Sequence, residues 1–197
     1  MIGSEEAIGI MTRKFLPWLI LGFFIGLLLL TWFIQSPYVQ RKIYPLKYKN
    51  EVIRYSLEYD LDPHLVMSII WVESKFKPNA TSHKNARGLM QIIPRTGQWI
   101  AEQVGLSHYD DDMLYDPKTN IMFGCWYLAY LLRVFDGDVE LALASYNGGM
   151  GNVIKWLKDD RYSDDGKTLK NIPIKETSEY IERVQKAYKQ YKKLYKI

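Results

Sequence analysis

The chain has few of the residues from which disulfides and metal sites are built. One of its 197 residues is a cysteine, Cys125, so no disulfide can form within the chain. Its three histidines, His64, His83 and His108, are scattered and have no cysteine partner at the spacing of a zinc site. Cys125 falls inside an apolar run, where we expect a small buried hydrophobic side chain. The sequence thus predicts no metal and no disulfide framework, and we interpret the histidines as surface residues or as supports behind a site.

Strand-like alternation and internal repeats are also missing. No window alternates apolar and polar residues over several positions, so strands should be few. Apolar residues recur instead at helical spacing. Asp62-Pro63 and Asp116-Pro117 are typical of helix starts, with Asp as the N-cap and Pro in the first turn, and Asp138 is a third candidate cap. The sequence predicts a mainly α fold with helices packed around a groove. The expected helices cover residues 48–59, 63 to just beyond 73, 94–104, 117–135, 139–146, a short segment ending near 158, and 177–195.

Charge is absent from one long stretch near the N-terminus, residues 15–34. This is about the length that crosses a bilayer, and Trp18 and Trp32 lie near its ends, as interfacial anchors do. A cleavable signal peptide is the alternative, but the apolar run is longer than a usual signal core and no small-residue cleavage site follows. We therefore expect an uncleaved single-pass anchor. The predicted organisation is a short cytoplasmic tail at 1–14, the anchor at 15–34, a linker at 35–47 and one globular domain at 48–197.

Glu73 stands out as a candidate acid. It lies four residues after Ile69 and three after Ile70, on the buried edge of an apolar helical stripe, and Pro78 ends that helix soon afterwards. Burial raises the pKa of a carboxylate, and the negative end of the helix dipole acts in the same direction. A glutamic acid protonated near neutral pH is what general-acid cleavage of a glycosidic bond requires. Periodicity alone leaves the alternative of a helix-end glutamate with its carboxylate in solvent.

Five short segments, from Glu73 to Tyr180, carry a shared pattern. They are E-S-x-F-x-P-x-A-x-S from Glu73, A-R-G-L-M-Q from Ala86, N-I-x-x-G-x-x-Y-L from Asn120, S-Y-N-G-G from Ser145 and E-T-x-x-Y from Glu176. In this order the segments resemble those of the soluble-type lytic transglycosylases, relatives of goose-type lysozymes, over roughly residues 48–188. Asn85 stands where that family usually has Gly, and Asn also tolerates a left-handed backbone.

The resemblance implies a lysozyme-like α+β fold and a site that needs no cofactor. It assigns Glu73 as the catalytic acid and base, Ser82 as the residue that orients the N-acetyl sugar, and Tyr146 as a hydrogen-bonding group at the reacting centre. The substrate-binding residues that it implies are Ser82, Met90, Gln91, Tyr146, Asn147, Glu176 and Tyr180. The residues themselves leave two alternatives open, because Met90 could pack in the core and Glu176 could cap the last helix.

The activity that the resemblance implies is cleavage of the β-1,4 bond between N-acetylmuramic acid and N-acetylglucosamine in peptidoglycan. Glu73 would protonate the glycosidic oxygen and then take the proton of the muramoyl C6 hydroxyl, so that a 1,6-anhydro ring closes. A hydrolytic muramidase on the same fold and a non-catalytic, membrane-tethered wall-binding scaffold are the alternatives. Residues 74–77 also match the S-x-x-K pattern of serine acyl-enzymes, but the companion S-D-N and K-T-G elements are missing.

Charge gives a weaker indication of location. The formal net charge is +4, which suits an anionic polymer such as cell wall but also a membrane surface or nucleic acid. The lysines and tyrosines of the last helix are interpreted as a solvated face with tyrosines packed on the domain, and no nucleic acid is expected as a partner. The expected location is the bacterial cell membrane.

Membrane orientation and self-association rest on short patterns at the two ends of the apolar stretch and within it. Basic residues both before and after residues 15–34 make the positive-inside rule favour a cytoplasmic domain. We nevertheless expect the domain on the extracytoplasmic side, where the implied substrate lies. Gly22 and Gly26 form a G-x-x-x-G pattern that would allow weak helix-mediated self-association.

Overall fold

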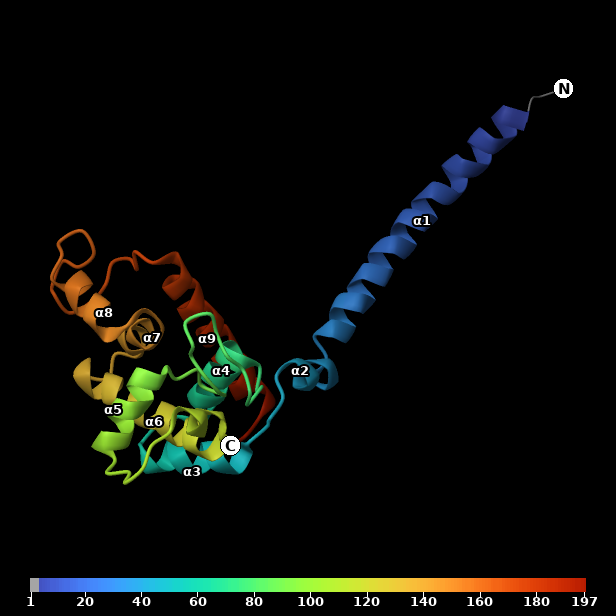
Figure 1. The fold of residues 1–197 in the computed structure, drawn as a ribbon. Helices are drawn as coiled ribbons and strands as arrows, with labels where there is room; N and C mark the ends of the chain where they lie inside the picture. The colour runs from blue at the N-terminus through green and yellow to red at the C-terminus, as the bar shows by residue number, and fades with distance from the viewer. Residues whose placement is uncertain (1–3) are drawn as a thin grey trace. The chain divides into compact units, whose positions relative to one another are not determined.

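The structure is a computed structural model that describes residues 4–197, with side chains from residue 16 onward. The chain divides into two units, residues 1–45 and residues 46–197. The first contains α1 (Ser4–Ile34) and α2 (Pro37–Ile43) (Figure 1). The helix α1 begins well before the expected span, so most of the expected N-terminal tail is helical. The positive-inside argument depends in part on Arg13 and Lys14, which are the basic residues before the apolar stretch. Their side chains are not among those that the structure describes.

The part of α1 from Leu16 to Ile34 is long and apolar enough to cross a membrane. Its side chains are exposed, including both tryptophans. The expected linker is more ordered than its composition suggests, since α2 occupies two helical turns of it. Ser36 caps α2 by accepting a hydrogen bond from the backbone N–H of Val39, and Pro37 fills the first helical position.

The second unit is helical throughout its regular structure. Its elements are α3 (Lys49–Glu58), α4 (Pro63–Ser74), α5 (Pro94–Gln103), the 3₁₀ helix η1 (Asp111–Tyr115), α6 (Pro117–Val134), α7 (Val139–Gly148), α8 (Met150–Leu157) and α9 (Lys175–Leu194). Among the described residues, extended pairing is limited to isolated bridges of Arg87 with Thr81 and Ile92. The prediction of a mainly α fold is therefore confirmed, and the predicted helix bounds are close to the observed ones.

Three of the helix starts use the predicted aspartates. Asp62, Asp116 and Asp138 each accept a hydrogen bond from a backbone N–H of the first turn that follows. The helix η1 was not predicted. Asp111 and Asp112 are exposed, and Asp110 caps the segment by accepting a hydrogen bond from the backbone N–H of Asp112, which stabilises one 3₁₀ turn.

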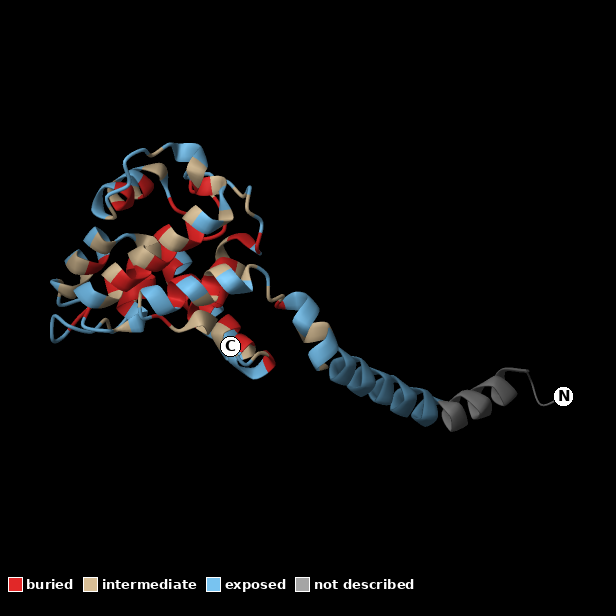
Figure 2. Cartoon of the chain, turned by 90° about the horizontal axis from the view of Figure 1, so that it is seen from below, coloured by how far each residue is buried: buried red, intermediate tan, exposed pale blue. Residues whose placement is uncertain are grey.

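The helix α4 lies at the centre of this unit. Val66, Met67, Ile69 and Ile70 are completely buried, so the helix is apolar on nearly every side. It packs along α9 and against α3, and Figure 2 shows the buried residues gathered in the middle of the unit. The end of α4 is consequently fixed by packing over its whole length, which matters because Glu73 is in its last turn.

Two smaller predictions are also confirmed by packing. Cys125 is a free thiol, completely buried in α6. On α9 the lysines from Lys186 onward are exposed while Tyr191 is buried and the hydroxyl of Tyr188 donates to Asp62, so this end of the helix is a solvated face packed through its tyrosines.

Candidate functional site

Glu73 occupies the point where α4 stops. The helix ends at Ser74, and the next two residues, Lys75 and Phe76, both have positive φ angles, of 52° and 59°. Non-glycine residues rarely adopt this conformation, and here it turns the chain sharply away from the helix axis. Because the backbone leaves in this way, the half-buried side chain of Glu73 faces an open groove instead of a further helical turn.

The electrostatic surroundings of Glu73 favour its neutral form. Burial raises the pKa of Glu73 to about 7. The nearby hydroxyl of Tyr180 and the positive charge of Arg183 act in the opposite direction, and the negative charge of Glu176 adds a smaller increase. A carboxyl group with such a pKa is present in both protonation states near neutral pH, so it can either donate or accept a proton.

The groove beside Glu73 has a volume of about 460 Å³. It is formed by the end of α4, the loop between α4 and α5, the end of α7 and the first turn of α9. Six of the eight predicted site residues line it: Glu73, Ser82, Gln91, Tyr146, Asn147 and Glu176. Residues that are separated by about a hundred positions in the sequence thus meet on one surface of the molecule.

Met90 and Tyr180, the other two predicted site residues, do not line the groove. Both side chains are fully buried. Met90 fits against Gly124 of α6, where an added Cβ would collide with the Met90 side chain. Its backbone carbonyl accepts a hydrogen bond from the hydroxyl of Tyr146 at 2.9 Å. Tyr180 lies behind Glu73, and its hydroxyl forms no hydrogen bond of standard geometry with another described residue although it is close enough to affect the acid.

Asn120 fixes the loop that carries Ser82 and Gln91. From the first turn of α6 its amide nitrogen donates to the carbonyls of Arg87 and Leu114, at 2.9 and 2.8 Å, and its Oδ1 accepts from the backbone N–H of Met90 at 2.7 Å. Gly88 approaches so closely that a Cβ there would collide with the Leu114 carbonyl and the Asn120 side chain. Asn85 has a φ of 60°, the left-handed conformation expected for it.

Three polar side chains in the groove keep hydrogen-bonding capacity after their internal contacts are made. Ser82 Oγ accepts from the backbone N–H groups of Lys84 and Ala86, which leaves its O–H as a donor. Gln91 donates through Nε2 to the carbonyls of Ala80 and Gly88, which leaves Oε1 as an acceptor.

Asn147 is the third of these side chains. Its Oδ1 accepts from the hydroxyl of Thr177 at 2.9 Å, which leaves its amide nitrogen as a donor. The groove therefore presents donors and an acceptor at fixed positions around one protonatable carboxyl group.

Several groove residues were not predicted as site residues. His83, Lys84, Ile93, Thr96 and Tyr127 all line it. The motif that begins at Asn120 already contained Tyr127, whose ring lies 5.4 Å from that of Tyr146. The other four gave no signal. His83, Lys84 and Ile93 reach the groove through the path of the loop, and Thr96 lies in the first turn of α5.

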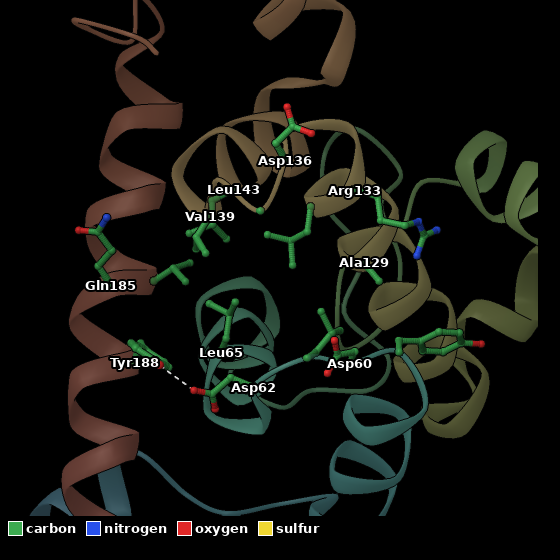
Figure 3. Close-up of a pocket in the computed structure, with 15 residues that line it drawn as sticks. Asp60, Asp62, Leu65, Ala129, Arg133, Asp136, Val139, Leu143, Gln185 and Tyr188 are labelled. Carbon is green, nitrogen blue, oxygen red and sulfur yellow. Dashed lines mark hydrogen bonds between the residues drawn. The ribbon is translucent and has the colours of Figure 1, made fainter. Parts of the chain in front are cut away.

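A second cavity, of about 610 Å³, lies apart from this groove and is lined mainly by apolar side chains (Figure 3). It is larger, but Glu73, the carboxyl group whose pKa is raised by burial, lines the smaller groove. The smaller groove is the better candidate for chemistry because a perturbed acid and convergent polar groups occur there together. No group of three or more potential metal ligands occurs in residues 16–197.

Comparison with known proteins gives the same family as the motifs. Residues 50–169 match the family of the transglycosylase SLT domain. The soluble lytic murein transglycosylase of Salmonella typhimurium is 33% identical over 143 residues, which cover 72% of this chain and 22% of that protein. The corresponding protein of Escherichia coli is 32% identical over the same length and coverage. The chain therefore spans about a fifth of the length of these relatives.

Solved structures agree. An inactive glutamate-to-glutamine mutant of the lytic transglycosylase Slt from Pseudomonas aeruginosa has a TM-score of 0.68 and 30% identity, covering 77% of this chain and 25% of that one. The 70 kDa soluble lytic transglycosylase from Escherichia coli has a TM-score of 0.70 and 28% identity, covering 79% and 25%. A complex of a 70 kDa soluble lytic transglycosylase with bulgecin A matches equally well.

Proposed function

This chain belongs to the transglycosylase SLT domain family, and we propose that it is a peptidoglycan lytic transglycosylase. The substrate is the β-1,4 bond between N-acetylmuramic acid and N-acetylglucosamine. The observation that carries the proposal is the position of Glu73, a carboxyl group with a pKa of about 7 at the floor of a polar groove. An inactive glutamate-to-glutamine variant of a relative with 30% identity supports the same assignment.

In the first step, Glu73 donates its proton to the glycosidic oxygen as the bond to the muramoyl C1 breaks. Because burial disfavours the negative carboxylate, the protonated form is available near neutral pH. The O–H of Ser82 donates to the N-acetyl carbonyl of the sugar and orients the group, which then stabilises the positive charge that develops at C1. No second carboxylate has to act as a nucleophile.

In the second step, the carboxylate of Glu73 removes the proton from the C6 hydroxyl of the muramoyl residue. The C6 oxygen attacks C1 and closes the 1,6-anhydro ring, so no water is consumed and Glu73 is protonated again. Tyr146 is held by its bond to the Met90 carbonyl at the side of the acid, and Gln91 and Asn147 bind sugar hydroxyls through their remaining acceptor and donor. Glu176 and Tyr180 lie after residues 50–169, which match the family. Glu176 forms part of the groove wall, and Tyr180 supports Glu73 from behind.

The product mass distinguishes this reaction from hydrolysis. Purified sacculi are digested with the protein and the released muropeptides are weighed. Products lighter by one water than those of a muramidase are expected, because the C6 oxygen replaces water as the attacking group. Muropeptides with a free reducing end would instead assign the fold to a hydrolase.

The substitution Glu73→Gln tests whether the domain is an enzyme or a wall-binding scaffold. We expect the rate of glycan cleavage to fall by at least roughly 10²–10⁴-fold, the usual contribution of a general acid. Binding to sacculi should be retained. The matched control is Glu102→Gln, the same chemical change at an exposed residue of α5. This variant should retain full activity. A change within the groove, such as Gln91→Glu, would not serve, because it adds a charge there. Cleavage by Glu73→Gln at the wild-type rate would remove Glu73 from the mechanism.

We further propose that residues 16–34 anchor the enzyme in the cell membrane as a single span, with the catalytic unit on the extracytoplasmic side. The length and composition of this part of α1 and the exposure of its apolar side chains support the proposal. The extracytoplasmic position follows from the location of peptidoglycan.

A further inference from the structure

The larger cavity lies among the helices that also build the catalytic groove. Its lining comes from the α3–α4 connection, the start of α4, the end of α6, the start of α7 and the middle of α9. Figure 3 shows Leu65 and Leu143 at its centre and Asp60, Asp62 and Asp136 at its edge. No residue lines both this cavity and the groove around Glu73. A ligand in the cavity would therefore leave the substrate groove open.

The cavity floor is apolar and its volume, about 610 Å³, is in the range of binding sites for apolar groups. Leu65, Ala129, Leu143 and Val184 are buried around it, whereas Val139 keeps 43% of its surface exposed at its mouth. None of the buried polar atoms that lack a partner in the described part of the chain belongs to the lining. Recognition at the floor thus depends on shape and apolar contact, with no buried polar group to select a small polar molecule.

The rim of the cavity is acidic on a chain that is basic overall. Three aspartates and one arginine, Arg133, line it, while the chain has a net charge of +4. Asp62 is already used, because its two oxygens accept from His64 and from the Tyr188 hydroxyl. The carboxylates of Asp60 and Asp136 make no hydrogen bond or ion pair with a side chain in the described residues, and both residues are exposed. Their charges are available to a ligand.

We propose that this cavity is a docking site for a basic amphipathic segment of a partner protein. Its apolar side chains would fill the floor, and its lysines or arginines would pair with Asp60 and Asp136. Grooves that bind amphipathic helices combine an apolar floor with charges at the edge in this way, and complementary charge at the rim fixes the orientation of the partner. The site recruits the enzyme to the partner without competing with glycan.

The test uses two synthetic 14-residue helical peptides with leucines at the same i, i+3, i+4 and i+7 positions. One carries lysines and alanines at the remaining positions, and the other carries glutamates in place of the lysines. Binding is followed by methyl NMR of leucine- and valine-labelled full chain in zwitterionic nanodiscs, with empty nanodiscs as a blank. The lysine peptide is expected to shift the methyl signals of Leu65, Val139 and Leu143 and to bind at least tenfold more tightly than the glutamate peptide.

Two variants separate the rim from the floor. Asp60→Asn with Asp136→Asn removes both charges, and Asn suits the positive φ angles of 54° and 52° found there. Val139→Ser removes apolar contact at an exposed position. Each variant is expected to bind the lysine peptide at least fivefold more weakly than wild type, with no loss of sacculus cleavage. The double change Asp111→Asn with Asp160→Asn, at exposed sites away from the cavity, should bind as wild type does.

Three outcomes would overturn the proposal. They are the absence of shifts at the cavity methyl groups at millimolar peptide, equal affinity for the two peptides, and equal weakening by the control pair. None of these outcomes bears on glycan cleavage, so the catalytic proposal is tested separately by the muropeptide masses.

Discussion

At the scale of single residues, the acid is the group whose environment does most to define the site. Its position at the end of an apolar helix could be predicted from Ile69, Ile70 and the proline that follows, because helical spacing is visible in a sequence. The same burial predicts that its pKa is raised, but the size of the shift could not be predicted, since Tyr180 and Arg183, which act against it, come more than a hundred residues later. The buried place of Met90 was equally hidden, as it depends on the absence of a Cβ at Gly124.

The raised pKa of Glu73 also predicts how stability depends on pH. The pKa is about 7 in the folded protein against an ordinary value of 4.5, so between these pH values the native state binds more protons than the unfolded state. Stability contributed by the neutral acid is therefore lost as pH rises from 4.5 to about 7. Glu73→Gln should be up to about 3 kcal/mol more stable than wild type at pH 8 and nearly equal to it at pH 4.

Urea unfolding of the two proteins from pH 4 to pH 8 measures this difference. Glu102→Gln, at an exposed site, should follow the wild-type curve at every pH. Parallel pH profiles for wild type and Glu73→Gln would show that the acid has an ordinary pKa, and the account of its neutral form would then be wrong.

At the scale of secondary structure elements, the helices follow from local patterns and the groove loop does not. Asp-Pro pairs and Asp138 marked three helix starts because a cap bonds to its own first turn. The loop from Lys75 to Ile93 contains only isolated bridges, and its path is set by Asn120 on another element. For this reason His83, Lys84 and Ile93 reach the groove without any sign in the sequence.

Asn120→Ala should show how much the loop depends on that one side chain. The change leaves two buried carbonyls and one N–H without their partner, and each such group costs about 1–3 kcal/mol. We expect a loss of roughly 2–5 kcal/mol in urea unfolding, and a larger fall in glycan cleavage than the stability loss alone explains, because Met90 no longer holds Tyr146 in place. Asn171→Ala, at an exposed position in the loop before α9, should change the stability by less than about 0.5 kcal/mol.

At the scale of the whole molecule, the chain combines a candidate membrane helix with a unit that has its own core. The chain divides after residue 45, whereas the apolar stretch in the sequence ends at residue 34 and the expected domain begins at residue 48. The assignment of these parts as anchor, linker and domain stays a prediction. The second cavity could not be predicted from the sequence, because its lining comes from three separate stretches of the chain, residues 59–65, 129–143 and 184–188.

Truncation tests this division. Residues 46–197 expressed alone should fold, remain soluble, and unfold within about 2 °C of the melting temperature of that unit in the full chain, since this unit has a buried core of its own. The full chain should remain with membranes after alkaline carbonate washing. Release of the full chain by carbonate would contradict the anchor at residues 16–34, and aggregation of the truncated chain would show that the first unit contributes to folding.

The shortness of the segment that joins the two units has a consequence for where cleavage occurs. Between the end of α1 at Ile34 and the start of the second unit at Leu46, seven of the eleven residues are helical in α2. A helix rises 1.5 Å per residue and extended chain about 3.5 Å, so this tether spans about 25 Å. On the proposal that residues 16–34 span the bilayer, the second unit begins no farther than about 25 Å from the membrane surface. We therefore expect it to act on the glycan strands nearest the membrane.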